Sequence, residues 1–139
     1  MPLKLSLRPD ERFVLNGAVV QNGDRRSVLI LQNKASVLRE KDILQPEDAN
    51  SPARHIYMSV MMMYIDEPRA GQYYQNFVLR MSEFMGVIQN ADVLSSCINI
   101  SKFCLEREYY KALMLCRKII EYEDQRLGNV APRLSAKLR

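Results

Sequence analysis

The sequence has few of the residues that enzymes and metal sites use. Its 139 residues include one histidine, His55, with no cysteine, aspartate or glutamate near it at metal-ligand spacing. The five glycines are scattered, so no glycine-rich loop can cradle a phosphate, and no Gly-x-Ser-x-Gly nucleophile motif is present. The acidic pairs Asp10–Glu11 and Asp66–Glu67 fall in expected turns, where solvated carboxylates are common. We therefore expect no enzyme and no bound metal or cofactor, with His55 on a helix surface or half-buried.

Long apolar segments and paired cysteines are also absent. The longest nearly uncharged run, Ile56–Ile65, is about half the length that spans a bilayer. The opening MPLKLSLRPDE lacks the apolar core of a secretory signal. The three cysteines, Cys97, Cys104 and Cys116, are odd in number and lie among apolar residues, which indicates reduced, buried thiols. We expect a cytoplasmic protein without a membrane partner.

What the sequence does contain is typical of a folded protein. Hydrophobic residues make up 47% of the chain and charged residues 26%, which argues against global disorder. The length fits one compact domain, or two small units that share a core. The net charge of +4 allows an anionic partner but does not demand one.

Residues 1–46 have the pattern of a small strand-rich module. Leucines alternate with polar residues in Leu3–Arg8, and Asn16–Gly17 is a strong hairpin signal. The continuous apolar run Val28–Leu31 is typical of a central strand covered on both faces. A module this small must pack on the rest of the chain or pair with a second copy, and we favour a homodimer. The predicted antiparallel strands are Leu3–Arg8, Arg12–Leu15, Ala18–Gln21, Ser27–Gln32 and Ala35–Glu40.

Residues 47–128 change to helical periodicity and predict a bundle of about four helices. Ser51 and Pro52 have the pattern of an N-cap and a first helical residue, and Asn90 is the next cap. Residues 66–71 separate the first two helices, the third runs to about residue 105, and Gly128 ends the last. The basic residues 129–139 are expected to form a mobile tail. The fold class is therefore α+β.

Basic residues are spread over the strand-rich part: Lys4, Arg8, Arg12, Arg25, Arg26, Lys34, Arg39 and Lys41. Seven acidic residues between Asp10 and Asp48 nearly cancel them by count. A binding surface would need one rim with the acids elsewhere, and that rim would be formed by Lys4, Ser6, Arg8 and Arg39. A mixed surface would only protect strand edges from aggregation. Phe13 is the only aromatic residue in this part, which disfavours a base-stacking platform. RNA would then be read by strand-edge hydrogen bonds and arginine contacts.

Seven of the eight methionines lie between Met58 and Met114. Met61, Met62 and Met63 are consecutive, so at least one of them should lie near the surface of its helix. Core filling is one explanation, and an adaptable surface for a protein partner is the other.

Three stretches of the chain carry a family resemblance: PLKLSLRPDERFVLNGAVVQNGDRR, QNKASVLREKDIL, and SPARHIY followed by MMMYID. With them the chain resembles the FlbT family of bacterial flagellin regulators over residues 1–120. The resemblance implies a non-enzymatic repressor that binds the 5′ untranslated region of flagellin messenger RNA and represses translation or promotes decay of that message. The alternative is a helical protein-interaction module that binds flagellin or a flagellar secretion or assembly partner.

The strand-rich part is also similar to the carbon storage regulator family, whose five strands interleave in a homodimer. The fifth predicted strand ends in Ser-Val-x-Arg-Glu, as in that family. In that family RNA lies along the first and fifth strands, and the matching residues here are Leu5, Ser6, Arg8, Val37 and Arg39. Two departures are Leu7, at a basic position, and Leu38, at a histidine. Together with the neighbouring cations, the predicted RNA-binding residues are Lys4, Leu5, Ser6, Arg8, Arg12, Val37, Arg39 and Lys41.

Overall fold

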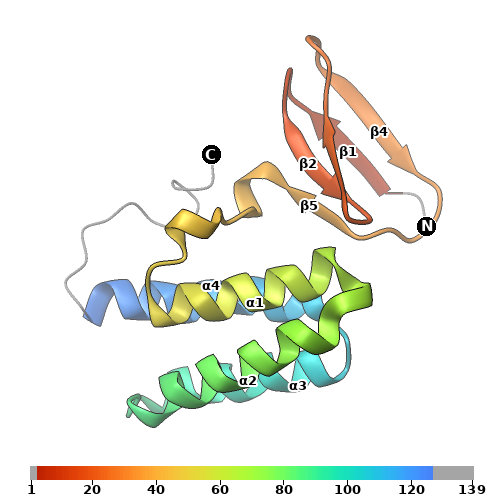
Figure 1. Cartoon of the computed structure of the whole chain (residues 1–139). Helices are drawn as coiled ribbons and strands as arrows, with labels where there is room; N and C mark the ends of the chain where they lie inside the picture. Colours follow the sequence, from red (N-terminus) through yellow and green to blue (C-terminus); the bar gives the residue numbers. More distant parts are fainter. Residues whose placement is uncertain (1–2, 127–139) are drawn as a thin grey trace.

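The computed structural model describes residues 3–126 and confirms the α+β fold, with five strands followed by four helices (Figure 1). The strands are β1 (Leu3–Leu7), β2 (Arg12–Leu15), β3 (Ala18–Gln21), β4 (Ser27–Leu31) and β5 (Val37–Arg39). The helices are α1 (Pro52–Ile65), α2 (Ala70–Gly86), α3 (Ala91–Leu105) and α4 (Tyr109–Arg126). Short 3-10 turns are η1 (Glu40–Asp42), η2 (Pro46–Asp48) and η3 (Glu67–Arg69). The predicted helix end at Gly128 and the predicted tail lie outside the described residues.

The strands form two antiparallel sheets, which together we call the strand module (residues 3–39). β1 pairs with β4, and β2 lies between β3 and β5. Leu5, Leu7 and Phe13 point inward and form a small core shared by the two sheets. The β2–β3 hairpin turns at Asn16 and Gly17, whose φ angles of 50° and 84° are those of the turn predicted from this residue pair.

The prediction that the fourth strand is covered on both faces is wrong for the described chain. Leu29 and Leu31 pack inward, but Val28 is 59% exposed and Ile30 49% exposed. These two side chains stand opposite Ser6 and Lys4 of β1, on the outer face of the β1–β4 sheet. The physical reason is that this two-stranded sheet has a packed layer on one side only, within residues 3–126.

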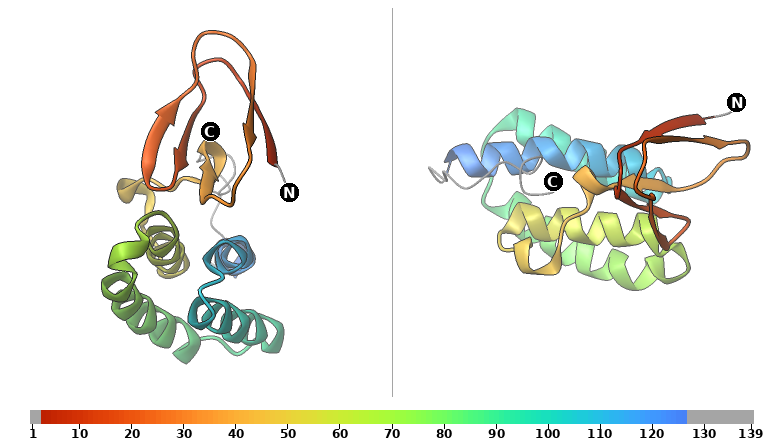
Figure 2. Two further views of the ribbon diagram at one scale, coloured as in Figure 1. Left: turned by 90° about the vertical axis from the view of Figure 1, so that its right-hand side faces the viewer. Right: turned by 90° about the horizontal axis from the view of Figure 1, so that it is seen from above.

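Helices α1 and α3 begin at the predicted caps. The Ser51 hydroxyl accepts a hydrogen bond from the Arg54 amide, and the Asn90 side chain accepts from the amides of Asp92 and Val93. α1 and α4 lie side by side next to the strand module, and α2 and α3 form the layer farther from it (Figures 1 and 2). We call residues 52–126 the helical bundle. Between residues 3 and 126, no helix combines the length and apolarity needed to cross a lipid bilayer.

Sulfur-containing side chains fill much of the bundle core. Cys97, Cys104 and Cys116 are buried and form no disulfide, as expected. Burial raises the pKa of Cys97 to about 11 and that of Cys104 to about 12, so both remain neutral thiols near pH 7. Met61, Met63 and Met81 are buried as well, whereas Met62 is half-buried. Core filling therefore explains most of the methionine-rich sequence.

A buried charge network joins the start of α1 to the end of α4 at one end of the bundle. Arg54 is only 3% exposed and donates two hydrogen bonds to the Asp124 carboxylate at 2.9 and 3.0 Å. Glu123 of α4, also buried, accepts a hydrogen bond from the Ala53 amide at 2.9 Å. The first turn of α1 is thereby fixed to the last turns of α4, which positions the layer that supports the strand module.

The strand module is attached to the bundle by side chains of both. Val14 and Leu38 belong to the same apolar core as the helices. The Tyr64 hydroxyl of α1 accepts a hydrogen bond from the Val37 amide at 2.9 Å and donates one to the Val37 carbonyl at 3.0 Å. Arg117 of α4 forms an ion pair with buried Asp42 of η1. These contacts fix β5 against the bundle and so determine the shape of the space between the two parts.

Candidate functional site

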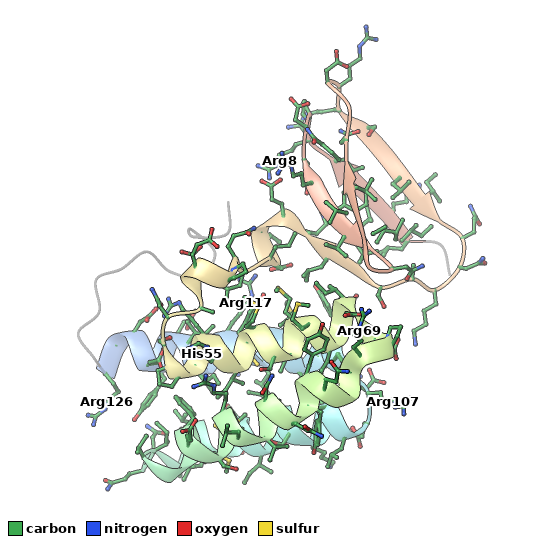
Figure 3. The ribbon with its side chains drawn as sticks, in the orientation of Figure 1. Arg8, His55, Arg69, Arg107, Arg117 and Arg126 are labelled. Atoms are coloured by element: carbon green, nitrogen blue, oxygen red, sulfur yellow. The ribbon has the colours of Figure 1, made fainter. Side chains whose placement is uncertain are left out.

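A cleft of about 910 Å³ lies between the strand module and the helical bundle. One wall comes from β1, β5 and the residues around them, and the other comes from the end of α1 and the corner between α3 and α4. Figure 3 shows Arg8 on the strand module and Arg107 at the α3–α4 corner, and both residues line this cleft. A smaller depression of about 370 Å³ shares Arg8 and Glu11 and continues toward Arg26.

Five of the eight RNA-binding residues predicted from the sequence line the cleft: Leu5, Arg8, Val37, Arg39 and Lys41. The other three lie elsewhere. Lys4 and Ser6 are exposed on the outer face of β1, next to Ile30 and Val28. Arg12 is exposed on β2, and its amide donates to the Glu40 carboxylate at 2.8 Å. The structure therefore divides the predicted set between the cleft and two outer surfaces.

The two arginines singled out from the strand motifs meet at Glu11. The Arg39 Nε donates to Glu11 Oε2 at 3.0 Å, and Nη2 donates to Glu11 Oε1 at 3.1 Å and to the Ser6 carbonyl at 2.7 Å. The Arg8 Nε lies 3.7 Å from Glu11 Oε1, and the Arg8 side chain is 59% exposed. Arg39 is thus held in the fold, while Arg8 is largely available to a ligand.

Glu11 is ionised because of these neighbours. Burial by itself would raise the pKa of the Glu11 carboxyl, but hydrogen bonds from the Arg8 amide and the Arg39 guanidinium, together with both arginine charges, lower that pKa below its usual value. The requirement that acidic groups lie away from the basic rim is therefore not met at this position. Glu11 stands between the two cations and occupies Arg39.

Away from Glu11, the cleft contains cations that are not paired with its acidic residues. Of its three other acidic residues, Asp42 is paired with Arg117 and Glu108 lies 3.9 Å from Lys111, while Glu67 forms no ion pair within residues 3–126. Both partners stand outside the set of lining residues. Three lining cations, Lys34, Lys41 and Arg107, form no ion pair within 4.0 Å among the described residues. Cations that can meet an anionic ligand thus occur along the cleft from Arg8 to Arg107.

Tyrosines of the helical bundle also line the cleft. The rings of Tyr64 and Tyr110 pack with centroids 5.6 Å apart, and Tyr110 remains 43% exposed. Tyr109 is half-buried beside them. These tyrosines, Lys34 and Arg107 were not among the RNA-binding residues predicted from the sequence, because aromatic groups were sought only in the strand-rich part. The interleaved basic and aromatic residues 107–111 (REYYK) were the available signal.

Arg107 has an unusual backbone. Its φ is 60°, a left-handed conformation that favours glycine and costs another residue roughly 1–2 kcal/mol. The conformation closes α3, because the Glu108 amide donates to the Phe103 carbonyl at 2.8 Å and the Arg107 amide donates to the Cys104 carbonyl at 3.1 Å. The turn directs the chain into α4 and places Tyr109 and Tyr110 at the cleft.

The two departures from the carbon storage regulator pattern have a structural reason. Leu7 is 5% exposed in the core of the strand module, and Leu38 is fully buried in the core shared with the helices. Neither position faces solvent, so a polar side chain at either one could not reach an RNA ligand.

His55 is half-buried on α1, as expected. Residues 3–126 contain no group of three or more histidine, cysteine, aspartate or glutamate side chains arranged to hold a metal ion. The cleft is therefore best described by its cations and tyrosines.

Comparison with known proteins assigns the chain to a family. Residues 3–127 match the family described as Flagellar protein FlbT. The chain belongs to the FlbT family. The flagellum biosynthesis repressor protein FlbT of Caulobacter vibrioides strain ATCC 19089 is 68% identical over 136 residues, which cover 98% of this chain and 96% of the relative. A probable flagellum biosynthesis repressor protein FlbT of Rhodopseudomonas palustris strain TIE-1 is 35% identical over 92% of this chain and 99% of the relative. No solved structure matches the chain.

The FlbT relatives confirm the family that the sequence motifs indicated, and they make this chain a regulator of flagellum biosynthesis. Their names describe a repressor and not a catalyst. The cleft is the feature of this structure that suggests how an FlbT protein could act.

Proposed function

We propose that this FlbT protein regulates flagellin synthesis after transcription, by binding the 5′ untranslated region of flagellin messenger RNA in the cleft. Binding there would repress translation or promote decay of the message. The observation that carries the proposal is the series of cations available along the cleft, Arg8, Lys34, Lys41 and Arg107, which fits the repeating negative charge of an RNA backbone.

The cations have the chemistry that this ligand requires. Arginine side chains bind phosphate or a guanine edge with two parallel hydrogen bonds, and lysines neutralise phosphate as point charges. On β5, the Val37 amide and carbonyl are already held by the Tyr64 hydroxyl, so the cations carry the proposed contacts with RNA. Leu5 is buried and Val37 is half-buried, so these two predicted residues shape the wall made by β1 and β5 and offer a ligand little surface.

Salt dependence of binding tests the proposal. Affinity of the full chain for a flagellin leader RNA should fall steeply as salt rises, because RNA phosphates exchange their counterions for protein cations. The variant Arg8→Ala/Lys34→Ala/Lys41→Ala should flatten a plot of log affinity against log salt by about two, since single-stranded RNA loses about 0.7 of slope per phosphate contact.

A matched control removes the same number of cations elsewhere. Arg80→Ala/Lys102→Ala/Lys118→Ala changes exposed residues of α2, α3 and α4 that do not line the cleft. It should leave the slope nearly unchanged. Equal slopes for the two triple variants, or no binding of leader RNA by the wild-type protein, would contradict the proposal that RNA binds in the cleft.

A second candidate function rests on exposed apolar side chains of the bundle. Val78 and Leu79 of α2 and Ile98 and Leu105 of α3 are between 43% and 69% exposed. Apolar groups on helices favour a protein partner, which here would be flagellin or a flagellar secretion or assembly factor. Capture of purified flagellin by the protein, lost in Leu79→Glu and Ile98→Glu variants that still bind leader RNA, would establish this function.

A further inference from the structure

We infer that the α3–α4 corner forms a base-stacking wall, in which Tyr110 holds an unpaired base and Arg107 holds its phosphate. The inference rests on the proposed binding of messenger RNA in the cleft and names the part of the RNA that the helical bundle recognises. It makes the site composite, with a basic wall from the strands and an aromatic wall from the helices.

Tyr110 has the exposure and the support of a stacking platform. It is 43% exposed at the first turn of α4, and its ring packs against Tyr64 with centroids 5.6 Å apart. Tyr64 is itself fixed, because its hydroxyl forms two hydrogen bonds with the backbone of Val37. A ring held in place in this way loses little conformational freedom when a base stacks on it.

Arg107 is placed where its charge can serve such a base. It lies at the corner in front of α4, it lines the cleft, and it has no ion-pair partner among the described residues (Figure 3). Arg107 is close enough to Tyr109 for its charge to act on the phenol. Burial raises the pKa of Tyr109, and the charge of Arg107 opposes that rise. An arginine beside tyrosines is the combination that binds single-stranded nucleic acid by stacking and charge.

The backbone of Arg107 gives an independent reason to look for a role of its side chain. The left-handed conformation at φ 60° suits glycine, yet the chain has arginine there. Strain retained at one residue is expected where the side chain itself is needed. The fold alone does not call for a guanidinium at this turn, since its two closing hydrogen bonds come from backbone amides.

The RNA class follows from the stacking geometry. A base stacks on a tyrosine only when it is free of its own neighbours, so the wall selects unpaired nucleotides in a loop or an open leader and discriminates against a duplex. The cations of the strand module, in contrast, contact any RNA backbone. Preference for single strands is thus assigned to the helical half of the protein.

The variant Arg107→Gly tests the role of the guanidinium apart from stability. It removes the charged group and at the same time relieves the strain of the left-handed backbone. Thermal unfolding should show a protein at least as stable as wild type, while affinity for a single-stranded leader fragment falls about threefold to tenfold. Arg80→Ala, which removes an exposed cation of α2 outside the cleft, should bind as wild type does.

Tyr110 is tested by a conservative pair of variants. Tyr110→Ala should weaken binding of the single-stranded fragment about tenfold, whereas Tyr110→Phe keeps the ring and should retain affinity. The sequence has no tryptophan but seven tyrosines, so the contact of Tyr110 is the part of the tyrosine quenching by the single strand that wild type shows and Tyr110→Ala lacks. This quenching should be smaller with the same fragment annealed to its complement.

The outcomes separate this inference from the proposed function. Wild-type affinity for the single strand in both Arg107→Gly and Tyr110→Ala, in a protein that still responds to the Arg8, Lys34 and Lys41 substitutions, would overturn the aromatic wall and leave RNA binding in place. Equal affinity of the wild-type protein for single strand and duplex would also overturn it. Absence of any RNA binding by the wild-type protein would overturn both proposals.

Discussion

The guanidinium of Arg39 forms two hydrogen bonds with the carboxylate of Glu11, at 3.0 and 3.1 Å, although the two residues are 28 positions apart. This pair connects β5 to the turn before β2, and both residues line the cleft. It also changes how Arg39 can be tested. Removing Arg39 alone would leave a buried carboxylate without its partner, so a loss of RNA binding by Arg39→Ala could come from the fold.

Glu11→Gln is the more informative substitution at this pair. It removes a negative charge from the cleft and frees Arg39 for phosphate, so leader RNA should bind about threefold to tenfold more tightly near 0.1 M salt. Fluorescence anisotropy with labelled leader RNA measures this. In an Arg39→Gln background the same substitution should give a smaller gain, and an undiminished gain there would contradict the release of Arg39 as the cause.

Acid stability should depend on the same carboxyl. The pKa of Glu11 is lowered in the folded protein, because the contacts with Arg8 and Arg39 outweigh the effect of burial, so this group stabilises the fold above its unfolded pKa of about 4.5. That contribution is lost as the pH falls from there through the folded pKa. Urea unfolding between pH 6 and pH 3 should show a smaller pH-dependent loss for Glu11→Gln than for wild type. Identical slopes would contradict the assignment.

Tyr64 is expected to hold the strand module on the bundle. Tyr64→Phe keeps the ring but removes both hydrogen bonds to Val37, which should lower the free energy of unfolding by about 1–3 kcal/mol. Hydrogen exchange should accelerate at the Val37 amide, which loses its acceptor, and change little in α3. Tyr122→Phe serves as the control, since no hydrogen bond of the Tyr122 hydroxyl supports the module. Unchanged exchange at Val37 would refute the role of the Tyr64 hydroxyl.

The outer face of the β1–β4 sheet leads us to expect a homodimer. Val28 and Ile30 are exposed there beside Lys4, and a second copy is the simplest cover for β-branched residues on a sheet face. Ile30→Lys should convert a dimer into a monomer with little loss of stability, because the residue is 49% exposed in the single chain. Sedimentation equilibrium gives the mass of each. A wild-type protein that is monomeric at all concentrations would exclude this dimer.

The strands and helix starts could be predicted because each depends on neighbouring residues. Asn16–Gly17 specifies a tight turn, and Ser51 with Pro52 specifies a helix start, whatever the rest of the chain does. The burial of β4 could not be predicted in this way. A run of four apolar residues has the same pattern whether the second face is covered or open, and only the arrangement of whole sheets decides between them.

The candidate site was predictable on one wall only. Arg8 and Arg39 follow from strand motifs, and both line the cleft. Arg107 and Tyr110 are more than sixty residues away from these strands in the sequence, and they reach the cleft only because α4 packs beside α1. Nor can the sequence show that Glu11, one of seven acids among residues 1–48, is the one that occupies Arg39.

Mapping of crosslinks tests the central claim most directly. Flagellin leader RNA carrying a photoreactive uridine would be crosslinked to the full-length wild-type protein, and the attached peptides identified by mass spectrometry. We predict that crosslinks concentrate on the two walls of the cleft, at residues 34–41 and 107–110. Crosslinks confined to α2 and the outward side of α3, with none in these two segments, would contradict the account.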